Sequence, residues 1–364
     1  MPPMPLLSPR LLSASARALF SLPPSVLGRL LGPAPRNDRG HPLDPQTQLL
    51  VRLAGLLRPR LDRAHVAEMR RKMDAQAPMV DVPPERLHRV EDLTLAVPGA
   101  SLRARLYVPH APGDGAPGPL CVFFHGGGWV QGSLASHDGV CRLLARRAGC
   151  KVLAVDYRTA PEHPFPTPPQ DALAAFRWAV AHAAELGVDP ARIAVAGDSA
   201  GGNLAAVVAR EEGAAVCFQL LVYPSTDLTR SHASHRTFAR GFLLDKEGMD
   251  FFLDCYLTDP ASQERDPLGS PLWAELPRGV APAYVLTAGF DPLRDEGEAY
   301  AEKLRQAGVA VEAVCEEQLI HGCFNMGGVV DAARVAVERA VDALARGLHA
   351  PRAAEAPPRA AKVS

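Results

Sequence analysis

Six short, continuously apolar runs are spaced along the chain from residue 120 onward, and helical patterns of apolar positions stand among them. Runs that are apolar at every position suit strands buried on both faces. The strand-like runs are residues 120–124, 152–155, 193–196, 220–223, 284–288 and 309–314, and the helical patterns are residues 170–186, 200–210, 293–306 and 329–348. This order predicts an α/β fold with a largely parallel, twisted sheet and helices on both faces.

A two-stranded hairpin is predicted ahead of this sheet. Leu93, Leu95 and Val97 alternate with polar neighbours, Pro98-Gly99 supplies turn residues, and the alternation resumes at residue 102. Alternating apolar positions on both sides of a Pro-Gly turn indicate an antiparallel pair.

Residues 226–279 interrupt the succession of strands and helices. They begin with a polar stretch, contain no clear strand and carry large aromatic side chains that include Phe242, Phe251, Phe252, Tyr256 and Trp273. We expect a helical insertion over the carboxyl edge of the sheet, where open α/β folds bind their ligands.

The first 37 residues carry four arginines and no acidic residue. Apolar residues at helical spacing, Leu12 and Ala16 among them, predict two short amphipathic helices on either side of Pro23-Pro24, and residues 46–57 predict a third. Three interpretations of this arm stay open: packing as part of a cap, weak contact with a membrane interface, or disorder. We expect no secretory signal, because Arg17 interrupts the apolar stretch, and no membrane span, because no apolar stretch is long enough.

The charge of the chain is nearly balanced. Its 364 residues include 39 Lys and Arg against 40 Asp and Glu, a net charge of −1, so we expect no nucleic-acid partner attracted by bulk positive charge. The balance is uneven along the chain, since residues 1–90 hold 14 Lys and Arg against 7 Asp and Glu, which leaves −8 for the remainder. A basic arm and cap therefore precede an acidic body.

Seven cysteines, an odd number, show neither a CxxC spacing nor a Cys/His metal pattern. Most of them lie in apolar runs, which predicts buried free thiols in a reducing compartment rather than a disulfide framework. We therefore expect a cytoplasmic protein without a metal site.

A predicted strand leads directly into a Gly-x-Ser-x-Gly motif and then into a helix at Ser199. Gly197 and Gly201 flank the serine because so tight a turn strains the serine backbone and leaves no room for neighbouring side chains. The helix that follows points its N-terminal amides at the same place, which favours developing negative charge. The motif predicts Ser199 as a nucleophile; the alternative is a glycine-rich helix start that Ser199 merely caps.

Three consecutive glycines follow the apolar run that ends at residue 124. In the sequence HGGGW, residues 125–129, the backbone can approach a ligand closely and direct its amides at one point. We predict that the amides of Gly127, Gly128 and Ala200 form an oxyanion hole, and that His125 is structural. The alternatives are a plain turn and a phosphate-binding loop, and the lack of a following Lys-Ser or Lys-Thr argues against the latter.

A nucleophilic serine needs a base, and the base needs an acid to orient it. Composition cannot choose among twelve histidines, but in hydrolases built on such an elbow the acid and then the base follow the nucleophile, on loops after late strands. Asp291 and His321 occupy those positions. Asp291 also fits a helix N-cap followed by Pro292, and Asp295, one turn later, is the competing acid.

Together these motifs resemble the hormone-sensitive-lipase-like esterases, the GDSAG subgroup of the α/β-hydrolases. The resemblance covers about residues 90–345 and rests on HGGGW, DYRTAPEHPFP at residues 156–166, GDSAGGNLA at residues 197–205, Tyr223-Pro224, DPLRDEG at residues 291–297 and His321-Gly322. It implies an α/β-hydrolase fold with a helical cap, a triad of Ser199, Asp291 and His321, and neither a metal nor a cofactor. It also implies that Tyr157 and Glu162 support the oxyanion strand without taking part in catalysis.

The chain departs from the family pattern at two places. Relatives usually have His-Gly-Phe at the base, whereas Cys323 here separates Gly322 from Phe324, which alters the wall beside the base. The N-terminal arm is also longer and richer in Arg and Pro than the minimal family cap. We expect catalysis to tolerate the first change.

We therefore expect a serine carboxylesterase acting on short- to medium-chain esters of small molecules, with Trp129, Phe242 and Phe324 beside the substrate. Lipase activity, amide or lactone hydrolysis on the same triad, and a catalytically silent receptor are the alternatives. An exposed edge strand or the cap would allow a homodimer. The predicted organisation is an arm with cap helices over residues 1–90, a core over residues 91–225 and 280–348, a cap insertion over residues 226–279 and a disordered tail over residues 349–364.

Overall fold

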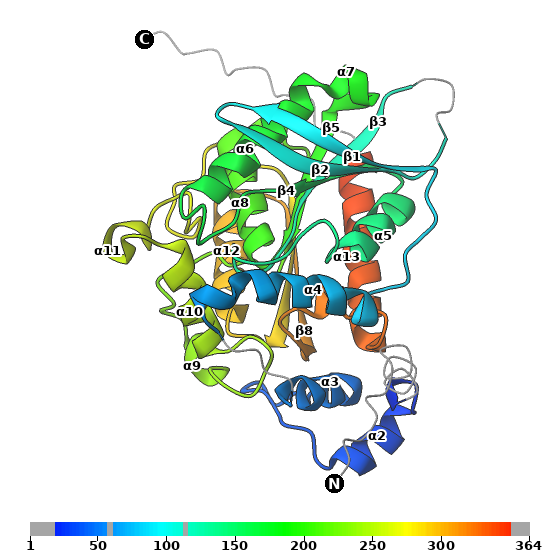
Figure 1. Ribbon diagram of the computed structural model, residues 1–364, viewed down its shortest axis with the longest axis vertical. Coiled ribbons are helices and arrows are strands. Elements are labelled where there is room, and N and C mark those ends of the chain that lie inside the picture. The colour runs from blue at the N-terminus through cyan, green and yellow to red at the C-terminus, as the bar shows by residue number, and fades with distance from the viewer. Residues whose placement is uncertain (1–18, 57–60, 112–115, 351–364) are drawn as a thin grey trace, which may run out of the picture.

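An eight-stranded sheet runs through the centre of the protein (Figure 1). The computed structural model describes residues 19–56, 61–111 and 116–350. The strands lie in the order β1-β2-β4-β3-β5-β6-β7-β8, with parallel pairing from β4 to β8 and antiparallel pairing of β2 with β1 and β4. They are β1 (Arg89–Val97), β2 (Ala100–Val108), β3 (Gly118–Phe124), β4 (Lys151–Asp156), β5 (Val188–Asp198), β6 (Gln219–Val222), β7 (Ala283–Phe290) and β8 (Val311–Ile320).

The predicted strands and hairpin are present. Each of the six apolar runs overlaps one of the strands β3 to β8, and the parallel pairing of these strands confirms the largely parallel sheet. In the hairpin Leu95 pairs with Leu102 and Leu93 with Ala104, so the alternating apolar side chains of β1 and β2 lie on the same face.

Helices cover both faces of the sheet (Figure 1). Along β3, Leu120 and Val122 face the layer of α6, α8 and α12, whereas Cys121 and Phe123 face the layer of α5 and α13. This burial on both sides is why the strands are apolar at every position. The helices of the two layers are α5 (Asp138–Ala148), α6 (Thr167–Ala181), α8 (Ala200–Glu212), α12 (Arg294–Gln306) and α13 (Asp331–His349), and the short α7 (Ala183–Leu186) follows α6.

Two segments far apart in sequence supply further helices beyond the two layers (Figure 1). The N-terminal segment forms α2 (Pro24–Leu31), α3 (Pro45–Gly55) and α4 (Val66–Val80), and the insertion forms α9 (Ala233–Thr237), α10 (Lys246–Tyr256) and α11 (Pro260–Gln263). Helices α4 and α10 both contribute side chains to the pocket beside Ser199. The division into core and cap at residues 90, 225 and 279 stays a prediction.

The described part of the N-terminal arm is attached to the core. The amide of Asp44 donates to the Gln318 carbonyl at 3.0 Å, and the side chain of Gln46 accepts a hydrogen bond of 2.8 Å from the Asp331 amide at the start of α13. The arm helix predicted around Leu12 lies outside the described residues. So does the tail predicted to be disordered over residues 349–364, apart from its first two residues, of which His349 ends α13.

Several elements differ from the sequence prediction. Strand β8 continues to Ile320 instead of ending at residue 314, and helices α4 and α5 were not predicted. Acidic residues interrupt β8, and at this edge of the sheet they can reach arginines: Glu312 pairs with Arg346 at 2.7 Å, and Glu317 pairs with Arg39 at 3.0 Å. Because these charges stay in contact with solvent, an edge strand tolerates them where a central strand would not.

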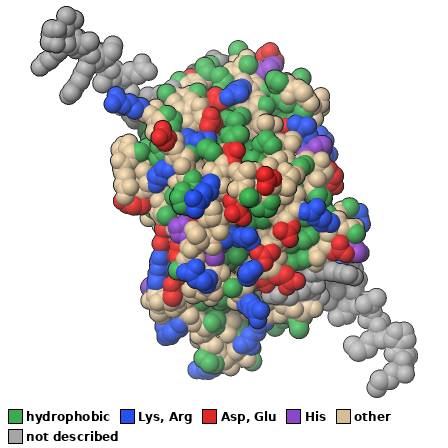
Figure 2. All heavy atoms as spheres, turned by 90° about the vertical axis from the view of Figure 1, so that its left-hand side faces the viewer, with side chains coloured by type: hydrophobic (Ala, Val, Ile, Leu, Met, Phe, Trp, Pro, Cys, Tyr) green, Lys and Arg blue, Asp and Glu red, His purple; other side chains and the backbone are tan. Residues whose placement is uncertain are grey.

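The surface carries charges of both signs. Acidic and basic side chains are interspersed on the face shown in Figure 2 rather than gathered into one patch. None of the helices in the described ranges has the length and apolar character that crossing a bilayer requires.

Candidate active site

Ser199 stands at a sharp turn between the end of β5 and the start of α8. Its backbone has φ +56° and ψ −118°, a region that residues other than glycine rarely adopt. The turn is tight enough that a Cβ on Gly197 would collide with the Gly201 carbonyl, and one on Gly201 would collide with the Phe124 carbonyl. The two glycines therefore permit the close approach of β3, β5 and α8 that exposes the serine hydroxyl to the pocket.

His321 lies between Ser199 and Asp291. Its Nε2 is 2.8 Å from the Ser199 Oγ, and its Nδ1 is 2.8 Å from the Asp291 Oδ2. The Asp291 side chain is fully buried, and its other oxygen accepts a hydrogen bond of 2.8 Å from the Leu293 amide. Because an ionised carboxylate can only accept, the imidazole donates from Nδ1 and leaves Nε2 free to accept from the serine hydroxyl.

The competing acid is engaged elsewhere. Asp295 accepts hydrogen bonds from the Ser234 amide at 2.8 Å and from the Arg294 guanidinium at 2.9 Å. It therefore ties α9 to α12, and Asp291 is the carboxylate that contacts His321.

The glycine loop after β3 has an unusual backbone. Gly127, Gly128 and Trp129 all have positive φ, at 121°, 62° and 59°. Within the described part of the chain, the amides of Gly127, Gly128 and Ala200 donate to no protein group, and all three residues line the pocket at Ser199. Free amides around one point next to a serine hydroxyl can bind an oxyanion.

A buried ion pair lies behind this loop. His137 Nε2 is 3.1 Å from Asp198 Oδ1, and the same oxygen accepts a hydrogen bond of 2.9 Å from the Gly126 amide. Burial alone would raise the pKa of Asp198, but the charge and hydrogen bond of His137, with the Gly126 amide, hold that pKa below its usual value. In return Asp198 raises the pKa of His137, although burial opposes the shift. The first glycine of the loop is thus attached to a carboxylate that stays ionised.

His125 is structural in this arrangement. Its ring is stacked on Tyr157 with ring centres 4.3 Å apart, and the Tyr157 hydroxyl donates to the His125 carbonyl at 2.7 Å. Burial lowers the pKa of His125, so the imidazole is neutral near pH 7. Tyr157 thereby holds the end of β3 from which the loop departs.

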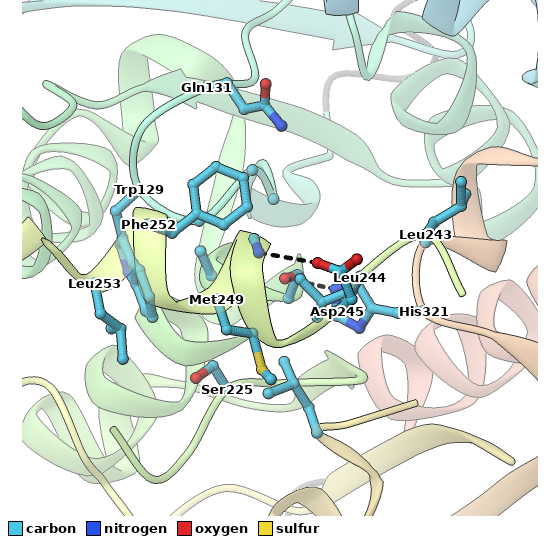
Figure 3. A pocket seen from close by; sticks show the side chains of 18 of the residues that line it. Trp129, Gln131, Ser225, Leu243, Leu244, Asp245, Met249, Phe252, Leu253 and His321 are labelled. Carbon is cyan, nitrogen blue, oxygen red and sulfur yellow. Dashed lines mark hydrogen bonds between the residues drawn. The ribbon is translucent and has the colours of Figure 1, made fainter. Parts of the chain in front are cut away.

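A cavity of about 500 Å³ opens in front of the serine. Figure 3 shows side chains that line it, with those of Phe252 and His321 among the labelled ones. Trp129, Met249, Phe252 and Leu253 form much of its apolar wall, and three of them come from α10. The Phe252 ring lies so close to Gly128 that a Cβ on the glycine would overlap it. The apolar wall therefore begins directly at the loop that carries the free amides.

Two of the three predicted substrate contacts lie away from this cavity. Trp129 lines it, and its ring is stacked on Tyr256 at 4.3 Å. Phe242 packs against Phe290 with ring centres 5.2 Å apart, and Phe324, in the turn that follows His321, is buried in the core. Met249 and Phe252 line the cavity wall instead of these two phenylalanines.

Comparison with known proteins agrees with this geometry. The family model described as α/β-hydrolase fold matches residues 121–325. Carboxylic ester hydrolase LipN of Mycobacterium tuberculosis is 44% identical over 300 residues, covering 79% of this chain and 78% of that protein. The chain belongs to the α/β-hydrolase family. The motifs of the sequence place it among the hormone-sensitive-lipase-like esterases of that family.

Further similar proteins also have names of ester hydrolases. Ethyl acetate hydrolase of Pseudomonas putida is 39% identical over 287 residues, covering 77% of this chain and 90% of that protein. The hyperthermophilic esterase of the archaeon Pyrobaculum calidifontis superposes with a TM-score of 0.78 at 39% identity, covering 84% of this chain and 98% of that structure.

Several residues of this α/β-hydrolase site were missed by sequence reasoning. Asp198 stands inside the GDSAG motif, and its place next to the serine was a signal that could have been used. His137 and Arg70 carry no local signal, because their partners are distant in sequence: His137 pairs with Asp198, and Arg70 on α4 donates to the Val130 carbonyl at the end of the glycine loop. Among the described residues, no three His, Cys, Asp or Glu side chains are grouped as a metal site would require.

Proposed function

We propose that this α/β-hydrolase is a carboxylic ester hydrolase that works through Ser199, His321 and Asp291. The observation that carries the proposal is the bridging position of His321, 2.8 Å from both the serine hydroxyl and the buried carboxylate, at the floor of an apolar cavity. The esterase names of the relatives support the same reaction.

Acylation is the first half of the reaction. His321 Nε2 accepts the hydroxyl proton while Ser199 Oγ bonds to the ester carbonyl carbon, and Asp291 stabilises the imidazolium that forms. The carbonyl oxygen becomes an oxyanion, and the free amides of Gly127, Gly128 and Ala200 are available to bind it. Collapse of this intermediate breaks the bond to the alcohol oxygen, and His321 gives that oxygen its proton.

Deacylation repeats the same steps with water. His321 takes a proton from a water molecule whose oxygen attacks the acyl carbon, and the amides bind the second oxyanion. When the bond to Ser199 Oγ breaks, His321 returns the proton to the serine, and the carboxylic acid leaves.

The cavity supports short- to medium-chain, mainly apolar substrates. Its volume of about 500 Å³ lies in the range of small-molecule sites, and its wall is built largely from Leu, Met and aromatic side chains. The Phe252 ring beside Gly128 leaves little space next to the carbonyl group. A small ester with an acyl chain between acetyl and octanoyl fits these features best.

The test is a series of p-nitrophenyl esters from acetate to octanoate, with wild type and Ser199→Ala compared at equal concentration. We expect the wild type to turn over at least one ester and the variant to lose this activity by about 10³-fold or more. A folded wild type without activity on the whole series would refute the proposal.

Ser225→Ala is the matched control for the serine substitution. Ser225 lines the same cavity, but both ring nitrogens of His321 are engaged by Ser199 and Asp291. The Ser225 hydroxyl is therefore not activated by the base, and its removal should leave the rate within about tenfold of wild type.

A contact of the arm with lipid surfaces has its own support. Leu30 and Leu56 are 67% and 81% exposed, and the basic residue Arg29 lies on the same short helix as Leu30. Exposed apolar side chains beside a cation favour an anionic interface. Sedimentation with vesicles containing anionic lipid, comparing wild type with Leu30→Asp, tests this contact, and equal sedimentation of the two would argue against it.

A homodimer and a cytoplasmic location complete the proposal. Strand β8 is the last strand of the sheet, and within the described residues the arm residues Asn37 and Asp44 bond to its backbone near its end, at Glu317 and Gln318. The rest of this edge favours pairing with a second copy, which light scattering can measure. The seven cysteines, all among the described residues, form no disulfide, as suits a reducing compartment.

A further inference from the structure

We propose that Arg70 is a positioning residue for the glycine loop after β3. It holds the Gly127 and Gly128 amides in the orientation that binds the oxyanion, and it couples this loop to the N-terminal helix α4. The inference deepens the proposed ester hydrolysis and rests on it. The hydrogen bonds of the Arg70 side chain go to backbone and side-chain groups outside the triad, so its effect passes through the backbone that it binds.

The guanidinium of Arg70 makes hydrogen bonds to two separate loops. Its Nε donates to the Val130 carbonyl at 2.7 Å, and its Nη2 donates to the Ala160 carbonyl at 2.8 Å and to the Thr159 hydroxyl at 3.0 Å. Both Nη atoms donate to Glu162, at 2.9 and 2.7 Å. Nη2 has two hydrogens for three acceptors, so its acceptors share them. A planar group with N–H donors in fixed directions can still reach both loops at once, whereas the three donors of a lysine spread from a single nitrogen.

The loop that receives these bonds needs an external restraint. Three successive residues, Gly127 to Trp129, have positive φ, and for Trp129 this conformation is unfavourable. Inside the loop, the Gly127 carbonyl accepts from the amides of Val130 and Gln131. Two later carbonyls point outward: that of Trp129 accepts from the Ala160 amide at 2.8 Å, and that of Val130 accepts from Arg70.

Both outward carbonyls are therefore tied to the same neighbouring loop, the first directly and the second through Arg70. Released from Arg70, the peptide after Val130 can rotate, and the Gly127 and Gly128 amides can turn with the loop. Amides that are fixed before the reaction stabilise the oxyanion without reorganisation, and this advantage falls as they become mobile.

The bonds to the carbonyls matter more than the ion pair. The Glu162 side chain is 54% exposed, so solvent screens its attraction to Arg70. Val130 is buried, and loss of its partner would leave its carbonyl unsatisfied. Arg70 is consequently expected to act on the loop more strongly than Glu162 does.

The same helix also forms part of the cavity wall. Met69 and Met73 on α4 line the cavity, and Asp74 accepts a hydrogen bond of 2.6 Å from the Ser133 hydroxyl, just beyond the loop. Arg70 and Asp74 thus attach one cap helix to the loop at two points. Helix α4 therefore connects the part of the cavity wall formed by the two methionines with the loop that carries the glycine amides.

The experiment compares Arg70→Met with Arg71→Met, the same change at the next, exposed position of α4. Rates on p-nitrophenyl acetate are expressed per active site, counted by complete labelling of Ser199 with a fluorophosphonate. Removal of one oxyanion donor typically costs about 100- to 1,000-fold, so we expect loosened donors to lower kcat about 10- to 100-fold. KM for this small ester should stay within about twofold, because the lost stabilisation belongs to the transition state.

The control and the conservative variants complete the test. Arg71→Met should stay within about twofold of wild type, Arg70→Lys should fall between wild type and Arg70→Met, and Glu162→Gln should lose less than Arg70→Met. If Arg70→Met is unstable at the assay temperature, the test is the comparison of kcat per active site between Arg70→Lys and wild type. Equal kcat per active site in Arg70→Lys and wild type, or a rise in KM without a fall in kcat in either Arg70 variant, would overturn the inference.

Failure of the underlying function looks different. If the wild type hydrolyses no ester, or if Ser199→Ala is as active as wild type, the proposed function itself is wrong. An active wild type with unaffected Arg70 variants refutes only the role of Arg70.

Discussion

The Gly126 amide donates a hydrogen bond of 2.9 Å to the carboxylate of Asp198, the residue immediately before Ser199. This bond joins the start of the glycine loop to the serine turn, although the two come from different strands. Since the carboxylate also pairs with buried His137, the relative position of the loop and the serine depends on a charge that is almost wholly buried.

Asp198→Asn should destabilise the protein in a pH-dependent way. Folding lowers the pKa of Asp198 and raises that of His137. The ion pair therefore stabilises the folded state fully between pH 3.8 and pH 6.5, the pKa values of Asp and His in the unfolded chain. The contribution is lost as the pH rises through the raised His137 pKa. We expect urea unfolding at pH 6 to show a loss of about 3–5 kcal/mol, with a smaller loss at pH 9. Equal losses at both pH values would contradict this account.

Asp291→Asn should reduce kcat far more than Asp295→Asn. An asparagine at 291 would favour the wrong tautomer of His321 and could not stabilise its positive charge, which costs about 10³- to 10⁴-fold in triads of this kind. Asp295 contacts Ser234 and Arg294 instead, so its substitution should cost less than about tenfold. Steady-state rates on the best p-nitrophenyl ester give the comparison, and equal losses would mean that the acid is misassigned.

Phe252→Ala should shift the acyl-chain preference toward longer esters. The ring lies against Gly128, so its removal opens space beside the reacting carbonyl group. We expect the ratio of kcat/KM for octanoate to that for acetate to rise by about tenfold, a typical value for one or two methylenes in an apolar pocket. Phe242→Ala is the matched control, because Phe242 packs on Phe290 outside the cavity and should leave the ratio unchanged.

Asp81→Asn should stabilise the protein above neutral pH. Burial raises the pKa of Asp81 to about 7, while the unfolded carboxyl titrates near 3.8. The wild type therefore loses stability as the pH rises from about 4 to 7, because the unfolded chain ionises first, and asparagine does not titrate. The melting temperature of the variant should exceed that of wild type at pH 8, and the gain should shrink toward pH 4. A gain that is independent of pH would point to packing instead.

Much of the site could be predicted because its residues stand next to strand ends. Ser199 follows β5, Asp291 follows β7 and His321 follows β8, and parallel strands bring their carboxyl ends to one edge of the sheet. Local patterns of glycine and apolar residues mark each of these positions. The order of motifs along the chain was therefore enough to select three residues that lie within hydrogen-bond distance.

The rest depends on contacts that no local pattern encodes. Arg70 reaches Val130 and Glu162 across 60 and 92 residues, and no feature of its own helix distinguishes it from Arg71. The prediction of the residues in the cavity wall failed for a similar reason. Phe242 and Phe252 both lie in the aromatic insertion, and the sequence does not distinguish them. Only the packing of α10 against Gly128 separates them.

The place of α4 in the chain has a consequence for synthesis. This helix leaves the ribosome before the loops that Arg70 binds, so its partners near Val130 and Ala160 do not yet exist when it first forms. Few of its side chains, Val66 and Met69, are buried in the finished protein, and the rest are largely polar or exposed. Before it docks, a segment of this composition exposes no large apolar face to water. It can dock only after the residues that carry its carbonyl partners have been synthesised.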